Sequence, residues 1–244
     1  MRKIATSWFA VGLIFGLSLV CAAQNGKVET VGPLTDNTVP EGVRQALDSK
    51  GYRLTLDGGV PACELWVRKS VPAQTKKDVE SVAYPQLAES VLVGVVHFPQ
   101  AAADIRGQKI PAGFYTLRYA LMPNDGNHLG AAPNRDFLLL IPAATDANPN
   151  AIFKFQELMA LSGGATGTKH PGPLSLVAAD SGVTAPSVSK DDQDHWIFSA
   201  SMKLGSGEEL PFALVVKGTA QQRLAEFELS ANPRRSKALH QPQP

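Results

Sequence analysis

The chain has 244 residues, of which 23 are basic and 22 acidic, and its formal net charge is +1. This near-neutral balance excludes a general electrostatic attraction to nucleic acid or to anionic lipid. Aromatic residues make up only 7% of the chain, which argues against a broad aromatic platform for sugars.

The amino terminus has the pattern of a secretory signal peptide. Arg2 and Lys3 precede an uncharged apolar run, and Ala22-Ala23 supplies small residues before Gln24. Residues 1–23 are therefore predicted to be cleaved, and the mature protein is predicted to be exported to the periplasm or the medium. An uncleaved anchor is the alternative, but the apolar run is short for a membrane span. No transmembrane segment is expected after cleavage.

Cleavage changes both the charge and the cysteine content. Loss of Arg2 and Lys3 takes the 23 basic residues to 21 against 22 acidic ones, a net charge of −1. Cys21 is also lost, and its acylation as a lipoprotein is disfavoured by the bulky Val20 before it. Cys63 then remains alone, so it cannot form an internal disulfide. Its place in an alternating apolar stretch predicts a buried, inert thiol rather than a catalytic one.

Residue patterns after the signal peptide predict two short helices and a series of strands. Residues 24–39 are predicted to be a lead-in strand or a linker, and Pro40 to Lys50 a short helix. Alternation on both sides of Asp57-Gly58-Gly59 predicts a hairpin. A second helix is predicted from Asp146 to Leu161, ending at Gly163 and followed by a flexible connection. Apolar runs predict further strands at 91–98, 113–121, 137–141, 174–178, 196–202, 210–216 and 224–229.

Many short strands and only two short helices predict a mainly β fold, an antiparallel β-sandwich or a jelly-roll-like arrangement. Because no linker interrupts residues 40–230, this segment is predicted to form a single β-sandwich domain. Residues 231–244 contain basic residues and prolines but no acid, and predict a disordered tail.

A polar loop between two apolar strands, residues 123–136, is the strongest candidate for a functional feature. It carries Asp125, Asn127, His128, Arg135 and Asp136. These groups could bind a ligand or a metal ion, and His128 could act as a general base beside one of the carboxylates. The same asparagines and aspartates are also ordinary turn formers. Only His128 and the pair Arg135-Asp136 are residues that turn formation alone does not require.

The other candidate motifs are weaker. No two histidines have the spacing of a local metal-ligand pair, so a metal site would need His97, His128 and His170 from separate segments. The glycine-rich residues 162–169 depart from the phosphate-loop pattern and follow a helix instead of a strand. The acidic residues at 191–194 lack the spacing of a calcium loop and predict a solvated turn. A nucleophile elbow of the Gly-x-Ser-x-Gly type is absent from the sequence.

Five segments of the chain carry a resemblance to other proteins, namely 104–107, 110–119, 125–128, 135–140 and 167–171. They resemble segments of a group of uncharacterised exported bacterial proteins that share a domain of unknown function. The resemblance covers about residues 90–175 and implies export and a β-rich domain, without an established activity or catalytic residue. It draws attention to His128 and His170.

The leading hypothesis is a non-enzymatic exported β-sandwich, without a cofactor, that binds a small ligand, a glycan or a protein through the 123–136 loop. A metal-dependent hydrolase that uses His128 with His97 or His170 is one alternative, and a structural cell-envelope protein is another. The residues predicted to bind the ligand are Asp125, Asn127, His128, Arg135, Asp136 and His170.

Overall fold

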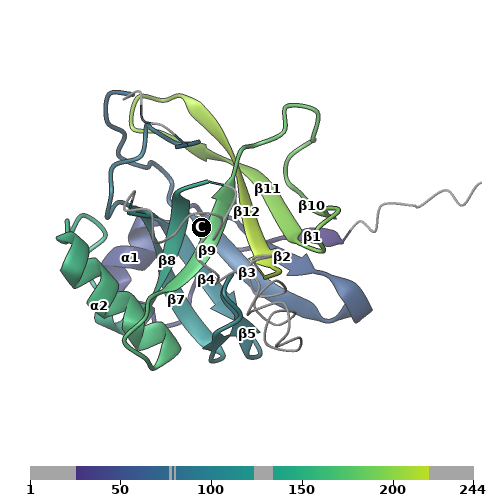
Figure 1. The fold of residues 1–244 in the computed structure, drawn as a ribbon, viewed down its shortest axis with the longest axis horizontal. Helices are drawn as coiled ribbons and strands as arrows, with labels where there is room; N and C mark the ends of the chain where they lie inside the picture. The colour runs from purple at the N-terminus through teal and green to yellow at the C-terminus, as the bar shows by residue number, and fades with distance from the viewer. Residues whose placement is uncertain (1–25, 77–78, 80, 124–133, 220–244) are drawn as a thin grey trace, which may run out of the picture.

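A computed structural model describes residues 26–76, 79, 81–123 and 134–219, and Figure 1 shows their arrangement. The helices are α1 (Glu41–Ala46) and α2 (Phe155–Thr166), with short 3-10 turns at Asp57–Gly59 and Ala143–Thr145. The strands are β1 (Lys27–Val31), β2 (Gly51–Thr55), β3 (Pro61–Val67), β4 (Leu92–Phe98), β5 (Ala102–Ala103), β6 (Lys109–Ile110), β7 (Gly113–Leu121), β8 (Asp136–Pro142), β9 (Gly172–Val177), β10 (Ser187–Lys190), β11 (Trp196–Lys203) and β12 (Glu209–Lys217).

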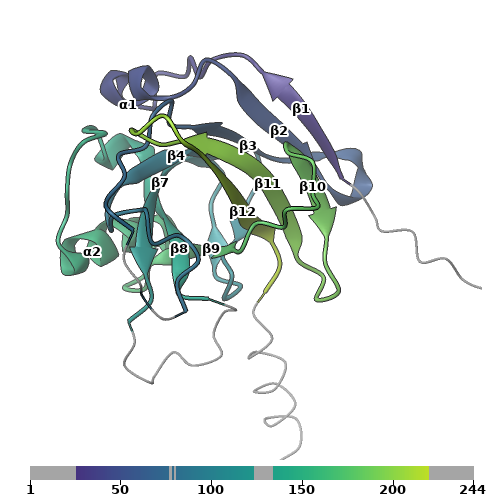
Figure 2. The same ribbon diagram turned by 90° about the horizontal axis from the view of Figure 1, so that it is seen from above.

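Ten of these strands form one antiparallel sheet in the order β1-β2-β3-β4-β7-β8-β9-β12-β11-β10, and β5 and β6 form a separate ribbon. The two edge strands, β1 and β10, lie against each other. The sheet is therefore nearly closed into a barrel, as the view in Figure 2 shows.

The predicted mainly β, antiparallel fold with two short helices is confirmed. The structure differs from the expected sandwich in having one continuous sheet instead of two stacked sheets. The reason lies in β9, which pairs with β8 on one side and with β12 on the other, so that hydrogen bonding passes without a break between the two halves.

The inside of the barrel is filled by alternate residues of the strands. Leu138 and Leu140 of β8 belong to the same buried cluster as Tyr52, Phe198 and Phe212 from the other side. The ring of Phe198 lies 5.4 Å from that of Tyr52 and 6.0 Å from that of Phe212, measured between centroids. Burial of each such side chain stabilises the fold by roughly 1.5–3 kcal/mol.

The two helical segments cover parts of the outer face. Trp66 and Leu92 pack with residues of the α1 segment, and Leu139 and Ile141 pack with α2. Figure 1 shows both helices on the same side of the molecule, and α2 lies against β8. Because α2 covers its outer face, β8 is buried on both faces, which explains its unbroken apolar sequence.

The predicted hairpin is confirmed as β2 and β3, and Cys63 is buried as expected. Burial raises the pKa of the Cys63 thiol from 9.0 to about 12, so the thiol is protonated at neutral pH.

Residues 27–31 form β1, in the segment predicted as a lead-in strand or a linker. Helix α1 ends four residues before Lys50, because Leu47 is extended and bridges to Arg68.

The prediction for the second helix was wrong at both ends. It begins at Phe155 instead of Asp146, because residues 146–151 are held against the outer face of β7 by Arg118. It ends at Thr166, so the first part of the predicted flexible connection is helical. Gly167, with φ of +66°, provides the left-handed cap.

The predicted signal peptide, the strand at 224–229 and the tail at 231–244 lie outside the described residues. Within the described part of the chain, neither helix has the length and apolar character needed to cross a bilayer.

Candidate functional site

The predicted site residues fall into two groups. Asp125, Asn127 and His128 lie outside the described residues. Arg135 and Asp136 are placed at the start of β8, and His170 lies just before β9. The structure therefore shows the base of the predicted loop and one of its possible neighbours.

Asp136 is fully buried and anchors a distant segment. Its carboxylate accepts hydrogen bonds from the backbone N–H groups of Ala83 and Tyr84, at 2.8 and 3.0 Å. The hydroxyl of Tyr119 donates a third, at 2.7 Å. Burial and this hydrogen bond raise the pKa of Tyr119 well above its usual range. These contacts give Asp136 a structural role, and its contribution to ligand binding stays a prediction.

The residues next to Asp136 fix both ends of the loop. The guanidinium of Arg135 donates through Nε to the carbonyl of Met122 at 2.8 Å, and the backbone of Met122 donates to the carbonyl of Arg135. The side chain of Asn134 donates to the carbonyl of Leu176 at 3.1 Å. The loop therefore leaves and rejoins the barrel at a rigid base.

His97 lies at the opposite end of the barrel wall. It faces Phe114 in the register of β4 and β7, whereas Asp136 faces Leu121 at the other end of β7. Seven residues of strand separate these positions, which corresponds to about 23 Å. His97 instead contacts Glu64 at 3.2 Å and stacks on the ring of Phe114. His97 and Asp136 therefore do not belong to one site.

No group of three or more histidine, cysteine, aspartate or glutamate side chains that could hold a metal ion occurs in the described part of the chain. The hydrolase hypothesis depends on His128, which is not among these residues, and it stays a prediction.

A groove of about 430 Å³ lies at the base of the loop, on the outer face of β7 and β8. We call it the loop-base groove. Met122 and Pro123 lead from it into the predicted loop, Phe137 and Leu139 of β8 form its floor, and His170 lies at its rim. It is also lined by Ile105, Arg106, Ala120, Leu121, Phe155, Met159, Lys169, Pro171 and Pro173.

The groove exists because α2 covers only part of the sheet. Leu158 of the helix is buried against Leu139 and Ile141, while Phe155 in the first turn keeps 39% of its surface exposed. Phe155 and Met159 therefore form one apolar wall above the strands. Exposed aromatic surface of this kind, next to a concave apolar floor, is typical of small-molecule sites.

The opposite wall is a turn built around the buried carboxylate of Asp104. This carboxylate accepts hydrogen bonds from the backbone N–H groups of Arg106 and Gln108, at 2.9 and 2.8 Å. It also forms an ion pair with the guanidinium of Arg106 at 3.4 Å. The same guanidinium donates to the carbonyl of Pro171, which joins the turn to the strand that follows His170.

The rim of the groove is basic. Arg106, Lys169 and His170 line it, and none of the described lining residues is acidic. The ion pair with Asp104 offsets part of the charge of Arg106, so the exposed Lys169 supplies most of the excess. The Nε of Arg106 is buried without a hydrogen-bond partner among the described residues. The arrangement can hold an apolar group on the floor and an anionic group at the rim.

The sequence predicts only part of this groove. It drew attention to His170 and to the base of the loop, but it missed Arg106, Phe155 and Met159. The helix prediction placed Phe155 and Met159 correctly on one face, although the helix was started too early. The pairing of that face with the 104–108 turn depends on contacts between distant segments, which local patterns do not contain.

Comparison of the chain with protein-family models, with curated proteins and with solved structures gave no match. The geometry of the described residues is therefore the basis for a functional conclusion.

Proposed function

We propose that this protein is an exported, non-enzymatic binding protein that holds an amphipathic anion in the loop-base groove. The ligand would place an apolar chain or ring on the floor and a carboxylate, sulfonate or phosphate group at the rim. The observation that carries this proposal is the combination of an apolar floor with a rim that is basic throughout the described residues.

The size of the groove fits this type of ligand. Its volume of about 430 Å³ lies in the range of small-molecule sites, which is roughly 300–1,000 Å³. Burial of the ligand's apolar surface would contribute about 25 cal/mol for each Å². The basic rim would then select amphipathic anions over neutral or cationic molecules of the same shape.

Two fluorescent probes with the same rings test the proposal on the mature chain. 8-Anilinonaphthalene-1-sulfonate carries a sulfonate, and N-phenyl-1-naphthylamine lacks it. We expect the sulfonate to bind saturably and more tightly, and its advantage to shrink as salt is added.

Matched variants assign the binding to the groove. Lys169→Gln should weaken binding of the sulfonate about three- to fivefold, the effect of losing an exposed ion pair, and leave the neutral probe unchanged. Lys27→Gln, on β1 at the other side of the barrel, is the control and should change neither. Met159→Gln should weaken both probes, because it makes the wall polar. Equal binding of the two probes, or insensitivity to both groove variants, would contradict the proposal.

A further inference from the structure

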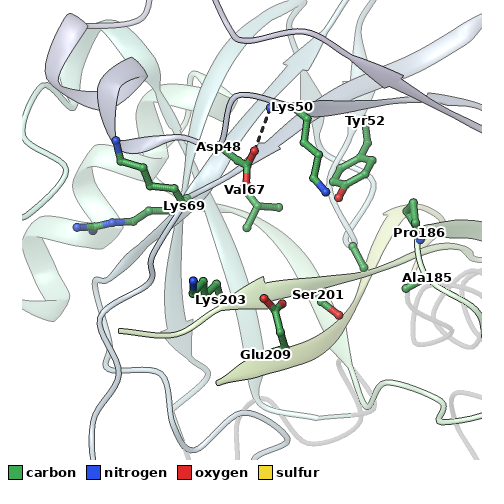
Figure 3. Close-up of a pocket in the computed structure, with 12 residues that line it drawn as sticks. Asp48, Lys50, Tyr52, Val67, Lys69, Ala185, Pro186, Ser201, Lys203 and Glu209 are labelled. Atoms are coloured by element: carbon green, nitrogen blue, oxygen red, sulfur yellow. Dashed lines mark hydrogen bonds between the residues drawn. The ribbon is translucent and has the colours of Figure 1, made fainter. Parts of the chain in front are cut away.

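A second pocket, of about 270 Å³, lies at one end of the barrel between β2–β3 and β11–β12 (Figure 3). It is polar, and it shares no described lining residue with the loop-base groove. Its walls include Lys50, Tyr52, Val67, Ser201, Lys203 and Glu209. We call it the end pocket.

The end pocket results from the different lengths of two neighbouring strands. β10 begins at Ser187, which pairs with Ser199 of β11. Residues 200–203 of β11 therefore have no β10 residue beside them, and Ala185 and Pro186 line the space instead. The pocket opens beside the seam between β1 and β10, the two edge strands, which no ladder of hydrogen bonds joins.

One polar group in the end pocket is held rigidly and is hydrogen-bonded to none of the described residues. Tyr52 is only 9% exposed, and its ring packs on that of Phe198 inside the barrel. Figure 3 shows its hydroxyl pointing into the pocket, and no hydrogen bond joins it to another described residue. A buried ring with an unpartnered hydroxyl is a preorganised hydrogen-bond donor.

A cation lines the same pocket as this hydroxyl. Figure 3 shows the side chains of Lys50 and Tyr52 both pointing into the pocket, whereas the ammonium of Lys69 points away from it. Lys50 forms no ion pair with any described residue. An ammonium and a hydroxyl that point into one pocket suit a carboxylate, because both can donate to its oxygens.

The remaining charged groups limit the class of ligand. Lys203 and Glu209 face each other across β11 and β12, so their charges largely cancel. The carboxylate of Asp48 accepts from the backbone of Lys50, and Arg68 donates to the carbonyl of Pro149. With Lys69 pointing away, the lining keeps one excess positive charge, because the opposite charges of Asp48 and Arg68 offset each other, and Glu209 and Ser201 offer acceptors to hydroxyl donors.

We infer that the end pocket binds a small sugar acid, that is, a monosaccharide that carries a carboxylate. The carboxylate is held by Lys50 and Tyr52, and the sugar hydroxyls donate to Glu209 and Ser201. This site is separate from the loop-base groove, and it stands whether or not the groove binds an amphipathic anion.

Titration of the ¹⁵N-labelled mature chain with D-glucuronate, acetate and D-glucose, followed by amide NMR shifts, tests the inference. Glucuronate should give saturable shifts confined to residues near Tyr52 and Ser201. Acetate has only the carboxylate and glucose only the hydroxyls, so each should bind at least about tenfold more weakly, as expected when hydrogen bonds to charged or buried groups are lost.

Single substitutions identify the residues responsible. Tyr52→Phe keeps the ring and removes the hydroxyl, and Lys50→Gln removes the charge, so each should weaken glucuronate binding about tenfold. Lys69→Gln is the matched control and should leave it unchanged. Glu209→Ala should reduce the preference for glucuronate over acetate, because it removes an acceptor for hydroxyls and a repulsive charge together.

The inference is overturned if glucuronate gives no saturable shifts in this region, or if Tyr52→Phe and Lys50→Gln bind it as tightly as the unaltered chain. Equal affinity for acetate and glucuronate overturns the assignment to sugar acids. The spectra of the variants also show directly whether each one is folded.

Discussion

Arg118 is a large charged residue that the described structure buries completely. It lies on the outer face of β7, and its side chain is fully buried. It donates two hydrogen bonds to the carboxylate of Asp146, at 2.6 and 2.7 Å, and others to the carbonyls of Ser90, Asn148 and Ala151. One guanidinium therefore fastens two separate segments, one at Ser90 and one at residues 146–151, to the barrel wall.

Asp146→Ala should lower the free energy of unfolding by about 3–5 kcal/mol, because it leaves the guanidinium of Arg118 buried without its counter-charge. Urea unfolding of the mature chain measures this loss. Arg53→Gln is the control, since it breaks the partly exposed pair with Glu64 and should cost less than about 1 kcal/mol. Similar losses for the two variants would contradict the structural role assigned to Arg118.

At this scale, the sequence allows the burial of Cys63 to be predicted, but not that of Arg118. Cys63 belongs to a regular alternation within one strand, so its side is set by its neighbours. An arginine on the outer face of a strand is ordinarily exposed to solvent. The burial of Arg118 depends on Asp146, which follows 28 residues later and had been assigned to the start of a helix. Pairing across that separation leaves no local pattern.

At the scale of elements, the carboxyl-terminal end of α2 shows how a glycine permits a close approach. The chain turns back after Gly167, and the backbone N–H of Thr168 donates to the carbonyl of Gly163. The hydroxyl of Ser162 in the same turn accepts from the N–H of Gly172 and donates to the carbonyl of Leu140. These contacts bring Lys169 and His170 to the rim of the loop-base groove.

Two neighbouring glycines should respond in opposite ways to alanine. A Cβ on Gly163 would lie 2.8 Å from the backbone oxygen of Thr168, so Gly163→Ala should push the turn away and cost about 1–3 kcal/mol. A Cβ on Gly164 would lie 3.4 Å from Pro142, an ordinary contact. Gly164→Ala should therefore stabilise the exposed helix position by about 0.5–1 kcal/mol.

Thermal unfolding of the two variants beside the unaltered chain measures the difference. Equal stability of Gly163→Ala and Gly164→Ala would contradict the predicted difference between the two positions. Since only the first variant moves the turn that carries Lys169, it should also weaken binding of the sulfonate probe in the groove.

The sequence predicted the central elements well and their ends less well. The alternation of residues predicts the hairpin of β2 and β3, and the unbroken apolar run predicts that β8 is buried on both faces. The start of α2 could not be predicted in this way, because the proline after Asn148 is an equally good start signal. The tertiary contacts of Arg118 exclude a start near Asn148, so the helix begins at Phe155. The start of the helix in turn sets the position of the groove's apolar wall.

At the scale of the whole molecule, strand order and closure are the features that the sequence leaves open. A sandwich and a barrel can be built from the same strands, with the same alternation of inward and outward residues. Here the choice depends on pairing between β9 and β12, and on the approach of β1 to β10. Neither pairing joins strands that are neighbours in the chain.

Closure of the barrel depends on a glycine just before β1. A Cβ on Gly26 would lie 2.7 Å from the backbone oxygen of Thr55 and 2.7 Å from Cγ1 of Val188 on β10. Gly26→Ala should therefore force β1 and β10 apart and lower the free energy of unfolding by about 1–3 kcal/mol. Gly32, just after β1, has no atom within 4 Å of its Cβ position, so Gly32→Ala is the matched control.

Hydrogen exchange distinguishes opening of the seam from general loss of stability. In Gly26→Ala, the amides of β1 and β10 should exchange faster relative to those of β7 and β8, which lie on the opposite wall. In Gly32→Ala, the ratio should stay as in the unaltered chain. Uniform acceleration across all strands, or equal behaviour of the two variants, would mean that the barrel is not held closed at Gly26. The end pocket borders the same seam, so a seam opened by Gly26→Ala should also weaken glucuronate binding.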